Sequence, residues 1–378
     1  MTVGTGGPLS ATATHVPPKV LYLEPIGVRG GMGRYNEALI MAYENAGAQV
    51  EFVTSSHDSS YGFRAKVHVS RFFRLALDRS KPRVLRAGGY VLGYLSCLPL
   101  ARRSDIVVMH FLHRPSIDRW ALRAFRRLGP RLVLVAHDPQ PVLRAQGGIA
   151  FQRALGAFDL IVVHGPKARI DIIAQGALGD RVVVAPFGEY RNSIPLDATA
   201  ARSALGIENM ARPVAAIIGN LKPGKGIKRA REALETQSSL VGTLLVAGRR
   251  QDDWDLEGAL RIPADSHLCV VRIDRRMSDQ EELAAYSLAD VVLALYDSGY
   301  SSAVIARAHS IGEPVVLTDV GDLAQQALPL DAVLPVDYSP EQLCEAIRRC
   351  IQAGRHAPDA WNVAAWALHA KTVLDRVG

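Results

Sequence analysis

Short apolar runs alternate with amphipathic segments along most of the first half of the chain. The apolar runs predict buried strands at 19–24, 49–56, 105–111, 131–138, 160–165 and 181–188. Segments whose apolar residues recur every three or four positions predict helices at 33–47, 116–129 and 166–176. A strand followed by a helix, many times over, is typical of a parallel sheet with helices on both faces.

The second half repeats this alternation after residues 189–212, whose polar and small residues predict a linker with a short helix. Strands are predicted at 214–220, 243–248, 267–273, 290–296, 314–319 and 332–337. Helices are predicted at 227–235, 279–288, 302–312 and 339–351. Residues 59–103 do not follow the alternation, because they mix aromatics, leucines and arginines around Pro82.

These patterns predict an α/β protein made of two Rossmann-like, doubly wound domains that face each other across a cleft. A length of 378 residues is sufficient for two such domains. We expect a loose tail at 1–18, a first domain at 19–188 and a second at 189–358. Residues 359–378 predict an amphipathic helix that returns toward the first domain.

Composition places the chain among globular proteins, with 21% charged and 48% apolar residues. No apolar run of about 18 residues predicts a membrane span, and the first residues lack the pattern of a signal peptide. The four cysteines are scattered without C-x-x-C spacing, at Cys97, Cys269, Cys344 and Cys350. This spacing argues against a zinc site or a disulfide framework and favours a reducing cytoplasm.

The net charge of +7 is unevenly distributed along the chain. Residues 1–188 contain 24 Lys and Arg against 12 Asp and Glu, whereas the remainder contains 20 against 25. The imbalance is greatest at 60–131, with 16 basic residues and three acids. Such a basic region indicates an anionic partner, either a membrane surface or a nucleic acid.

A strand, a glycine-rich turn with two lysines and a helix follow one another at 214–235. The turn GNLKPGKG spans Gly219 to Gly226 and contains Lys222 and Lys225. Unpaired amide groups at a helix N-terminus, the helix dipole and lysine charge together favour phosphate binding. An ordinary connection with two solvated lysines is the alternative.

Three segments of the sequence together resemble GT-B glycosyltransferases, and most closely their family 4 group. They are the loop GGMGR at 30–34, the turn at 219–226 and the segment YDSGYSSAVIARAHSIGEPVVLTDVG at 296–321. Two departures stand out. Asn220 replaces a common arginine, whose charge Lys222 could supply, and the family's E-x7-E acids would fall at Gly299 and Arg307. A sub-group without these glutamates fits Ser302 and its neighbours better.

The resemblance implies roles for residues on both sides of the cleft. In the second domain, Ser301 and Ser302 would contact the second phosphate or cap a helix, and Arg249 would reach the same anion or be a surface residue. Arg34 would contact a phosphate or the acceptor, or be a solvated residue of the first helical turn. The residues expected to bind the donor are Gly31, Gly33, Gly219, Asn220, Lys222, Lys225, Arg249, Ser301 and Ser302.

His137 and Asp138 end the predicted strand at 131–138, and the resemblance implies that His137 contacts the donor sugar. Asp138 would orient that imidazole or accept a proton from the acceptor. For His110, His113 and His164 packing is the preferred interpretation, and they show no metal-binding spacing. The glycine loop is not a G-x-G-x-x-G fingerprint, which argues against a nicotinamide cofactor.

The resulting hypothesis is a metal-independent hexosyltransferase that needs no cofactor. It would move a sugar from a UDP- or GDP-linked donor to a hydroxyl acceptor, such as a lipid-linked saccharide in bacterial exopolysaccharide or cell-envelope synthesis. Its place would be the cytoplasmic face of the plasma membrane, on anionic lipid. The alternatives are a non-catalytic scaffold with this fold and a sugar-nucleotide epimerase. A nucleic-acid partner is disfavoured, because 60–131 contains no recognition motif.

Overall fold

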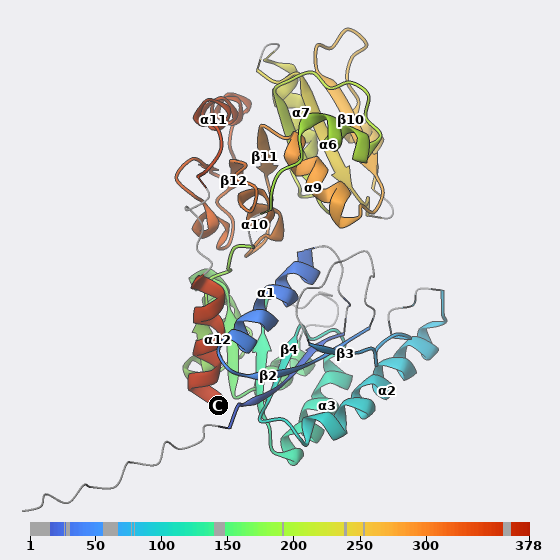
Figure 1. The fold of residues 1–378 in the computed structure, drawn as a ribbon, viewed down its shortest axis with the longest axis vertical. Coiled ribbons are helices and arrows are strands. Elements are labelled where there is room, and N and C mark those ends of the chain that lie inside the picture. The colour runs from blue at the N-terminus through green and yellow to red at the C-terminus, as the bar shows by residue number, and fades with distance from the viewer. Residues whose placement is uncertain are drawn as a thin grey trace, which may run out of the picture.

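The computed structural model describes residues 16–25, 27, 31–55, 67–76, 78, 80–139, 148–190, 193–237, 240–251, 254–357 and 364–378. Most of the predicted tail and Gly30 of the glycine loop lie outside these residues. The described chain forms two separate parallel sheets with helices around them, one above the other in Figure 1. The predicted fold class, two doubly wound parallel-sheet domains, is confirmed.

The first sheet has seven strands in the order β3-β2-β1-β4-β5-β6-β7. Its strands are β1 (Lys19–Glu24), β2 (Gln49–Thr54), β3 (His68–Ser70), β4 (Ile106–His110), β5 (Arg131–Val135), β6 (Leu160–Val163) and β7 (Val182–Val184). Every residue of β4 and β6 is buried, because helices cover both faces of the sheet. The helices of this domain are α1 (Gly31–Asn45), α2 (Arg83–Ala101), α3 (Pro115–Leu128), α4 (Ile149–Leu155) and α5 (Pro166–Ala174).

The second sheet has six strands in the order β10-β9-β8-β11-β12-β13. Its strands are β8 (Val214–Ile218), β9 (Thr243–Gly248), β10 (Cys269–Asp274), β11 (Val291–Ala294), β12 (Val315–Thr318) and β13 (Ala332–Leu334). Its helices are α6 (Ala198–Leu205), α7 (Ile227–Glu235), α8 (Leu256–Leu260), α9 (Asp279–Leu288), α10 (Ala303–His309) and α11 (Pro340–Ala353). The order changes direction between β8 and β11, which is where doubly wound sheets bind ligands.

The last helix, α12 (Ala364–Val377), leaves the second domain and lies beside α1 of the first (Figure 1). Trp366 fastens it, because the indole donates a hydrogen bond to the carbonyl of Glu189 at 2.6 Å and packs on Tyr190. Gly188 leaves room for this ring, since an added Cβ would lie 2.3 Å from it. The chain therefore crosses between the domains twice, and the two crossings hold each other.

Helix α2 occupies part of the segment whose pattern could not be interpreted. Its inner face packs on Phe73, whose ring lies against Gly93, and its outer face is also apolar. By length and composition α2 could cross a membrane, the only such helix in the described part of the chain. The expectation of no such helix is therefore corrected. About a third of α2 is buried in the first domain. Helices α4 and α8 were also not predicted.

Candidate functional site

The lysine turn lies where the second sheet changes direction, between β8 and α7. Its backbone needs glycine, because φ is 107° at Gly219, 78° at Gly224 and 68° at Gly226. Gly226 precedes the first residue of α7, so the free amide groups of that helix face the turn. Lys222 is exposed, and the turn lines a cavity of about 480 Å³ with the first turn of α7, Trp254 and Asp297.

The end of β9 lies directly beside this turn. The amide of Leu221 donates to the carbonyl of Arg249 at 2.9 Å. Gly248 has φ of 147°, and an added Cβ would lie 1.7 Å from the carbonyl oxygen of Gly219. The two strand ends can approach this closely because Gly248 has no side chain. Asn220 and Arg249 are both exposed and lie on these adjacent chain segments.

Tyr296, which lies just beyond the end of β11, joins the lysine turn to Ser302. The ammonium of Lys225 lies 4.0 Å from the centre of the Tyr296 ring, and the Tyr296 hydroxyl lies 3.0 Å from Oγ of Ser302. Sequence reasoning did not single out Tyr296. The available signal was an aromatic residue at the last position of the strand predicted at 290–296.

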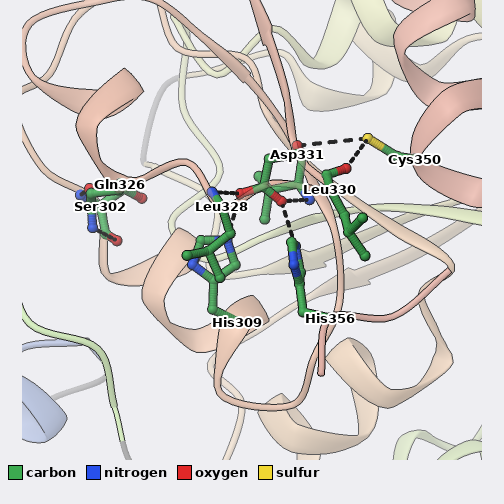
Figure 2. A network of polar contacts seen from close by, with 9 residues as sticks. Ser302, His309, Gln326, Leu328, Leu330, Asp331, Cys350 and His356 are labelled. Carbon is green, nitrogen blue, oxygen red and sulfur yellow. Dashed lines mark hydrogen bonds and ion pairs between the residues drawn. The ribbon is translucent and has the colours of Figure 1, made fainter. Parts of the chain in front are cut away.

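Ser302 is buried and precedes α10, but its side chain does not cap the helix. Its amide donates to Oε1 of Gln326 at 2.7 Å, and Nε2 of Gln326 donates to the Ser302 carbonyl at 3.3 Å (Figure 2). The capping interpretation is therefore wrong for Ser302, because the hydroxyl is bound to Tyr296 instead. Ser301 is half-buried.

In the first domain, half-buried His137 packs against a group of buried rings. Its Nε2 lies 2.9 Å from Nδ1 of His110, so one nitrogen donates and the other accepts. The Tyr35 ring lies 4.2 Å away and Phe111 stacks at 4.8 Å between centres. Burial, followed by the neighbouring His110, holds the pKa of His137 well below its usual value. His137 is therefore neutral at pH 7, while Asp138 beside it is exposed.

Two further histidines complete this histidine cluster of His110, His137, His164 and His369. His164 bonds the Tyr35 hydroxyl at 3.1 Å and the Ala185 carbonyl at 3.0 Å, and His369 reaches the cluster from α12. Burial lowers the pKa of His110 to about 3 and that of His164 to about 4. Both are packing residues, as preferred, whereas His369 is remote in sequence and gave no signal. His113 lies outside the cluster, and burial lowers its pKa to about 4.

The start of α1 meets the second domain directly. An added Cβ on Gly31 would lie 2.5 Å from Cβ of Ala303, so glycine is needed here for helix contact (Figure 1). The guanidinium of Arg34 forms an ion pair with Asp279 of α9, so the interpretation as a solvated residue is wrong. Gly33 is buried within α1.

The two positions where the family acids would fall serve other contacts. Arg307 is buried and donates to Oγ of Ser193 in the linker at 2.7 Å and to Oγ of Ser310 at 3.1 Å. Gly299 precedes Tyr300, whose hydroxyl donates to Asp171 of α5 at 2.6 Å. The chain therefore uses this region to join its domains.

Asp322 makes the most direct of these interdomain contacts. Its carboxylate accepts from the amides of Lys167 and Ala168 at 2.8 Å each, and so caps α5 of the first domain. Gly165 makes room for it, since an added Cβ would lie 2.1 Å from Cγ of Asp322. The helix receives its cap from a residue of the other domain.

His309, Asp331 and His356 are the one group among the described residues whose atoms are close enough to share a metal ion. The carboxylate of Asp331 accepts from both Nε2 atoms at 2.8 and 2.9 Å and from the amides of Val315 and Leu328 (Figure 2). Burial raises the pKa of Asp331, but the hydrogen bonds from the two histidines outweigh it and lower this pKa to about 2. With four donors on one carboxylate, the group fits a hydrogen-bonded clasp.

Comparisons with known proteins agree with this architecture. Residues 29–188 match the family described as Glycosyltransferase Family 4, and no curated protein matches the sequence. Sucrose-phosphate synthase from Thermosynechococcus elongatus has 16% identity and a TM-score of 0.66, with 95% of this chain and 98% of that chain covered. HepE from Anabaena, in complex with UDP and glucose, has 16% identity and a TM-score of 0.67, with 95% and 99% covered.

The lipopolysaccharide outer core galactosyltransferase WaaB has 14% identity and a TM-score of 0.60, with 95% of this chain and 99% of that chain covered. These similarities show the GT-B fold over nearly the whole length. The predicted resemblance to GT-B glycosyltransferases is confirmed, because the first domain matches Glycosyltransferase Family 4 and the whole chain has the GT-B fold.

Proposed function

We propose that this chain, a GT-B glycosyltransferase by its fold and by the family match in its first domain, moves a sugar from a nucleotide-sugar to the hydroxyl of a lipid-linked saccharide. The observation that carries the donor half is the lysine turn, where two cations, a helix start and three glycines with positive φ meet. HepE, which has this fold, is in complex with UDP and glucose. The donor diphosphate accordingly belongs on the second domain.

The chemistry rests on holding the leaving diphosphate. Transfer breaks the bond from the anomeric carbon to the diphosphate oxygen and forms one to the acceptor oxygen. Lys222, Lys225 and the amides at the start of α7 stabilise the charge that develops on the leaving group. His137 is neutral, so it serves the sugar as a hydrogen-bond partner, and the exposed carboxylate of Asp138 takes the acceptor proton. No metal or cofactor is needed in this scheme.

The acceptor half rests on the outer face of α2. Apolar side chains are exposed along it, with Val84 at 80% and Leu92 at 59%. Further exposed apolar residues of this face and the preceding turn are Phe72, Leu75, Leu85 and Leu95. Exposed arginines lie before, at the start of and beyond the helix, at Arg71, Arg74, Arg83, Arg102 and Arg103. An apolar strip between basic ends fits peripheral binding to an anionic bilayer, each basic residue contributing about 1 kcal/mol.

We infer that this surface binds the cytoplasmic face of the plasma membrane, where lipid-linked saccharides are assembled. WaaB, a lipopolysaccharide outer core galactosyltransferase, shares the fold, which supports a role in envelope or exopolysaccharide synthesis. Co-sedimentation with phosphatidylglycerol vesicles should fall as salt rises, because exposed charges are screened. Leu92→Glu should abolish it, whereas Leu368→Glu, on the exposed face of α12, should not. Equal binding to neutral vesicles would contradict the electrostatic part.

The deciding experiment has two stages. Nucleotide sugars with uracil, guanine and adenine bases are first screened for binding by thermal shift. Each that binds is then incubated with a polyprenyl-diphosphate-linked saccharide or with the free saccharide, and the products are identified. Transfer to the lipid-linked acceptor supports the proposal, and transfer only to the free saccharide overturns its acceptor half.

A scaffold without activity is the second candidate, because neither Gly299 nor Arg307 offers a carboxylate to the donor, and Arg307 is turned to the linker. Binding of nucleotide sugars without any product would favour it. An epimerised sugar in the absence of transfer would instead indicate an epimerase.

A further inference from the structure

We propose that Tyr296 is a positioning residue of the donor site, whose ring holds the ammonium of Lys225 where the donor diphosphate binds. This inference rests on the proposed function. The ammonium lies 4.0 Å from the ring centre, well within the distance at which a cation is attracted to the negative face of an aromatic ring. Tyr296 itself is only 8% exposed, so its ring is a fixed surface beneath the half-buried Lys225.

The backbone sets this pairing before any ligand binds. The amide of Asp297 donates to the carbonyl of Gly224 at 3.0 Å, which ties the residue after Tyr296 to the residue before Lys225. Gly226, on the other side of Lys225, lies so close to Leu295 that an added Cβ would be 2.5 Å from Cβ of that leucine. Ring and ammonium are therefore held in register from both sides.

The ring is in turn held at its far end. The hydroxyl of Tyr296 lies 3.0 Å from Oγ of Ser302, and Gln326 binds both the amide and the carbonyl of Ser302. The carbonyl of Tyr296 accepts from Oγ1 of Thr318 at 2.6 Å. A lysine side chain has four rotatable bonds, so ordering it on binding an anion costs entropy. A ring that already confines the ammonium lowers that cost and so strengthens anion binding.

The test changes the charge of the ring face and keeps its size. Phenylalanine and pentafluorophenylalanine at position 296 have nearly the same shape, but fluorination removes the negative face. Affinity is measured by calorimetry for uridine, guanosine and adenosine diphosphate in parallel. We expect Tyr296→Phe to stay within about twofold of wild type and the fluorinated variant to bind about fivefold more weakly. In a Lys225→Ala background the two variants should bind equally.

A second cation and ring on the same helix provide the control. Arg229 lies 4.7 Å from the ring centre of Tyr338 and pairs with Asp297, and Tyr338→Phe and its fluorinated form should leave diphosphate affinity unchanged. Equal affinity of the two Tyr296 variants in the wild-type background would overturn this inference and leave the donor site intact. Unchanged affinity in Lys225→Ala itself would instead overturn the proposed function.

Discussion

The carboxyl ends of the two sheets occupy equivalent places in the fold but carry opposite chemistry. In the first sheet, β4 ends at His110 and His164 directly follows β6, and these rings pack into a buried group that α12 covers with His369. In the second sheet, β9 ends at Gly248 and Gly219 directly follows β8, and the turn that begins at Gly219 contains exposed Lys222 and half-buried Lys225. A polar residue at a strand end therefore indicates a ligand site only when nothing else in the chain covers it.

The largest expected effect tests ligand binding at the carboxyl end of the second sheet. A nucleoside diphosphate at a hundredfold excess over its dissociation constant should stabilise the protein by about 2.7 kcal/mol. For domains of this size that corresponds to roughly 5–10 °C in Tm. Lys225→Ala should remove most of this shift and Lys222→Ala part of it, because Lys225 is the better confined cation. Thermal melts with and without ligand measure the shift.

Neither substitution should change the melt without ligand by much, since Lys222 is exposed and Lys225 is only half-buried. Absence of a shift in wild type with uridine, guanosine and adenosine diphosphate would remove the contrast between the two edges. The carboxyl end of the second sheet would then bind no nucleotide, and the scaffold interpretation would replace sugar transfer.

The next effect tests whether the carboxyl end of the first sheet, which α12 covers, contributes to catalysis. His137→Ala should lower turnover by about tenfold, the loss of one hydrogen bond to the reacting sugar. Affinity for the bare nucleoside diphosphate should stay the same, because His137 lies on the first domain and the lysine turn on the second. Steady-state kinetics and calorimetry on one preparation provide both values.

Phe111→Leu is the matched control, because it removes the ring stacked on His137 and keeps the imidazole. Equal loss of turnover in both variants would show that His137 acts through packing alone. The first edge would then have no chemical role.

The sequence predicted the sheets because buried parallel strands are continuous apolar runs, whatever they pack against. It did not predict α2, since a helix apolar on both faces has no helical period to read. It also located His137 and the lysine turn, whose signals are local. The partners of these residues are not local: Arg34 meets Asp279, and His137 shares its cluster with a histidine of the last helix. Only the folded chain brings them together.

A smaller effect tests how the two edges are joined. Asp322, which follows β12 of the second sheet, caps α5 of the first domain. Asp322→Ala should cost about 1 kcal/mol of unfolding free energy, as loss of an N-cap does. It should also loosen the arrangement of the domains, which small-angle X-ray scattering can measure as an increased radius of gyration.

Asp197→Ala is the control, because Asp197 caps α6 within its own domain through amides at 2.9 and 2.8 Å. It should cost a similar free energy and leave the scattering unchanged. Identical scattering of the two variants would show that the other interdomain contacts suffice.

The smallest effect tests whether water is excluded from His369, at the covered carboxyl end of the first sheet. Neither ring nitrogen of His369 has a hydrogen-bond partner among the described residues, and burial holds its pKa well below the usual value. His369→Phe should therefore raise the unfolding free energy by about 0.5 kcal/mol at pH 7, since a buried polar group is removed without loss of a bond. Its advantage should grow as pH falls below about 6.5, where the unfolded chain gains a proton on His369 that the folded chain refuses. Wild type then loses about 1.4 kcal/mol of unfolding free energy per pH unit at this residue, and the variant does not.

Denaturant melts from pH 7 to 5.5 measure the difference in unfolding free energy between the two proteins. Burial raises the pKa of Glu313 to about 8, but both proteins contain this residue, so its contribution cancels in the difference. The same exchange at exposed His267 should leave the difference flat. If the difference in unfolding free energy does not grow toward acid pH, water or a proton reaches His369 in the folded state. The carboxyl end of the first sheet would then be as accessible to solvent as that of the second.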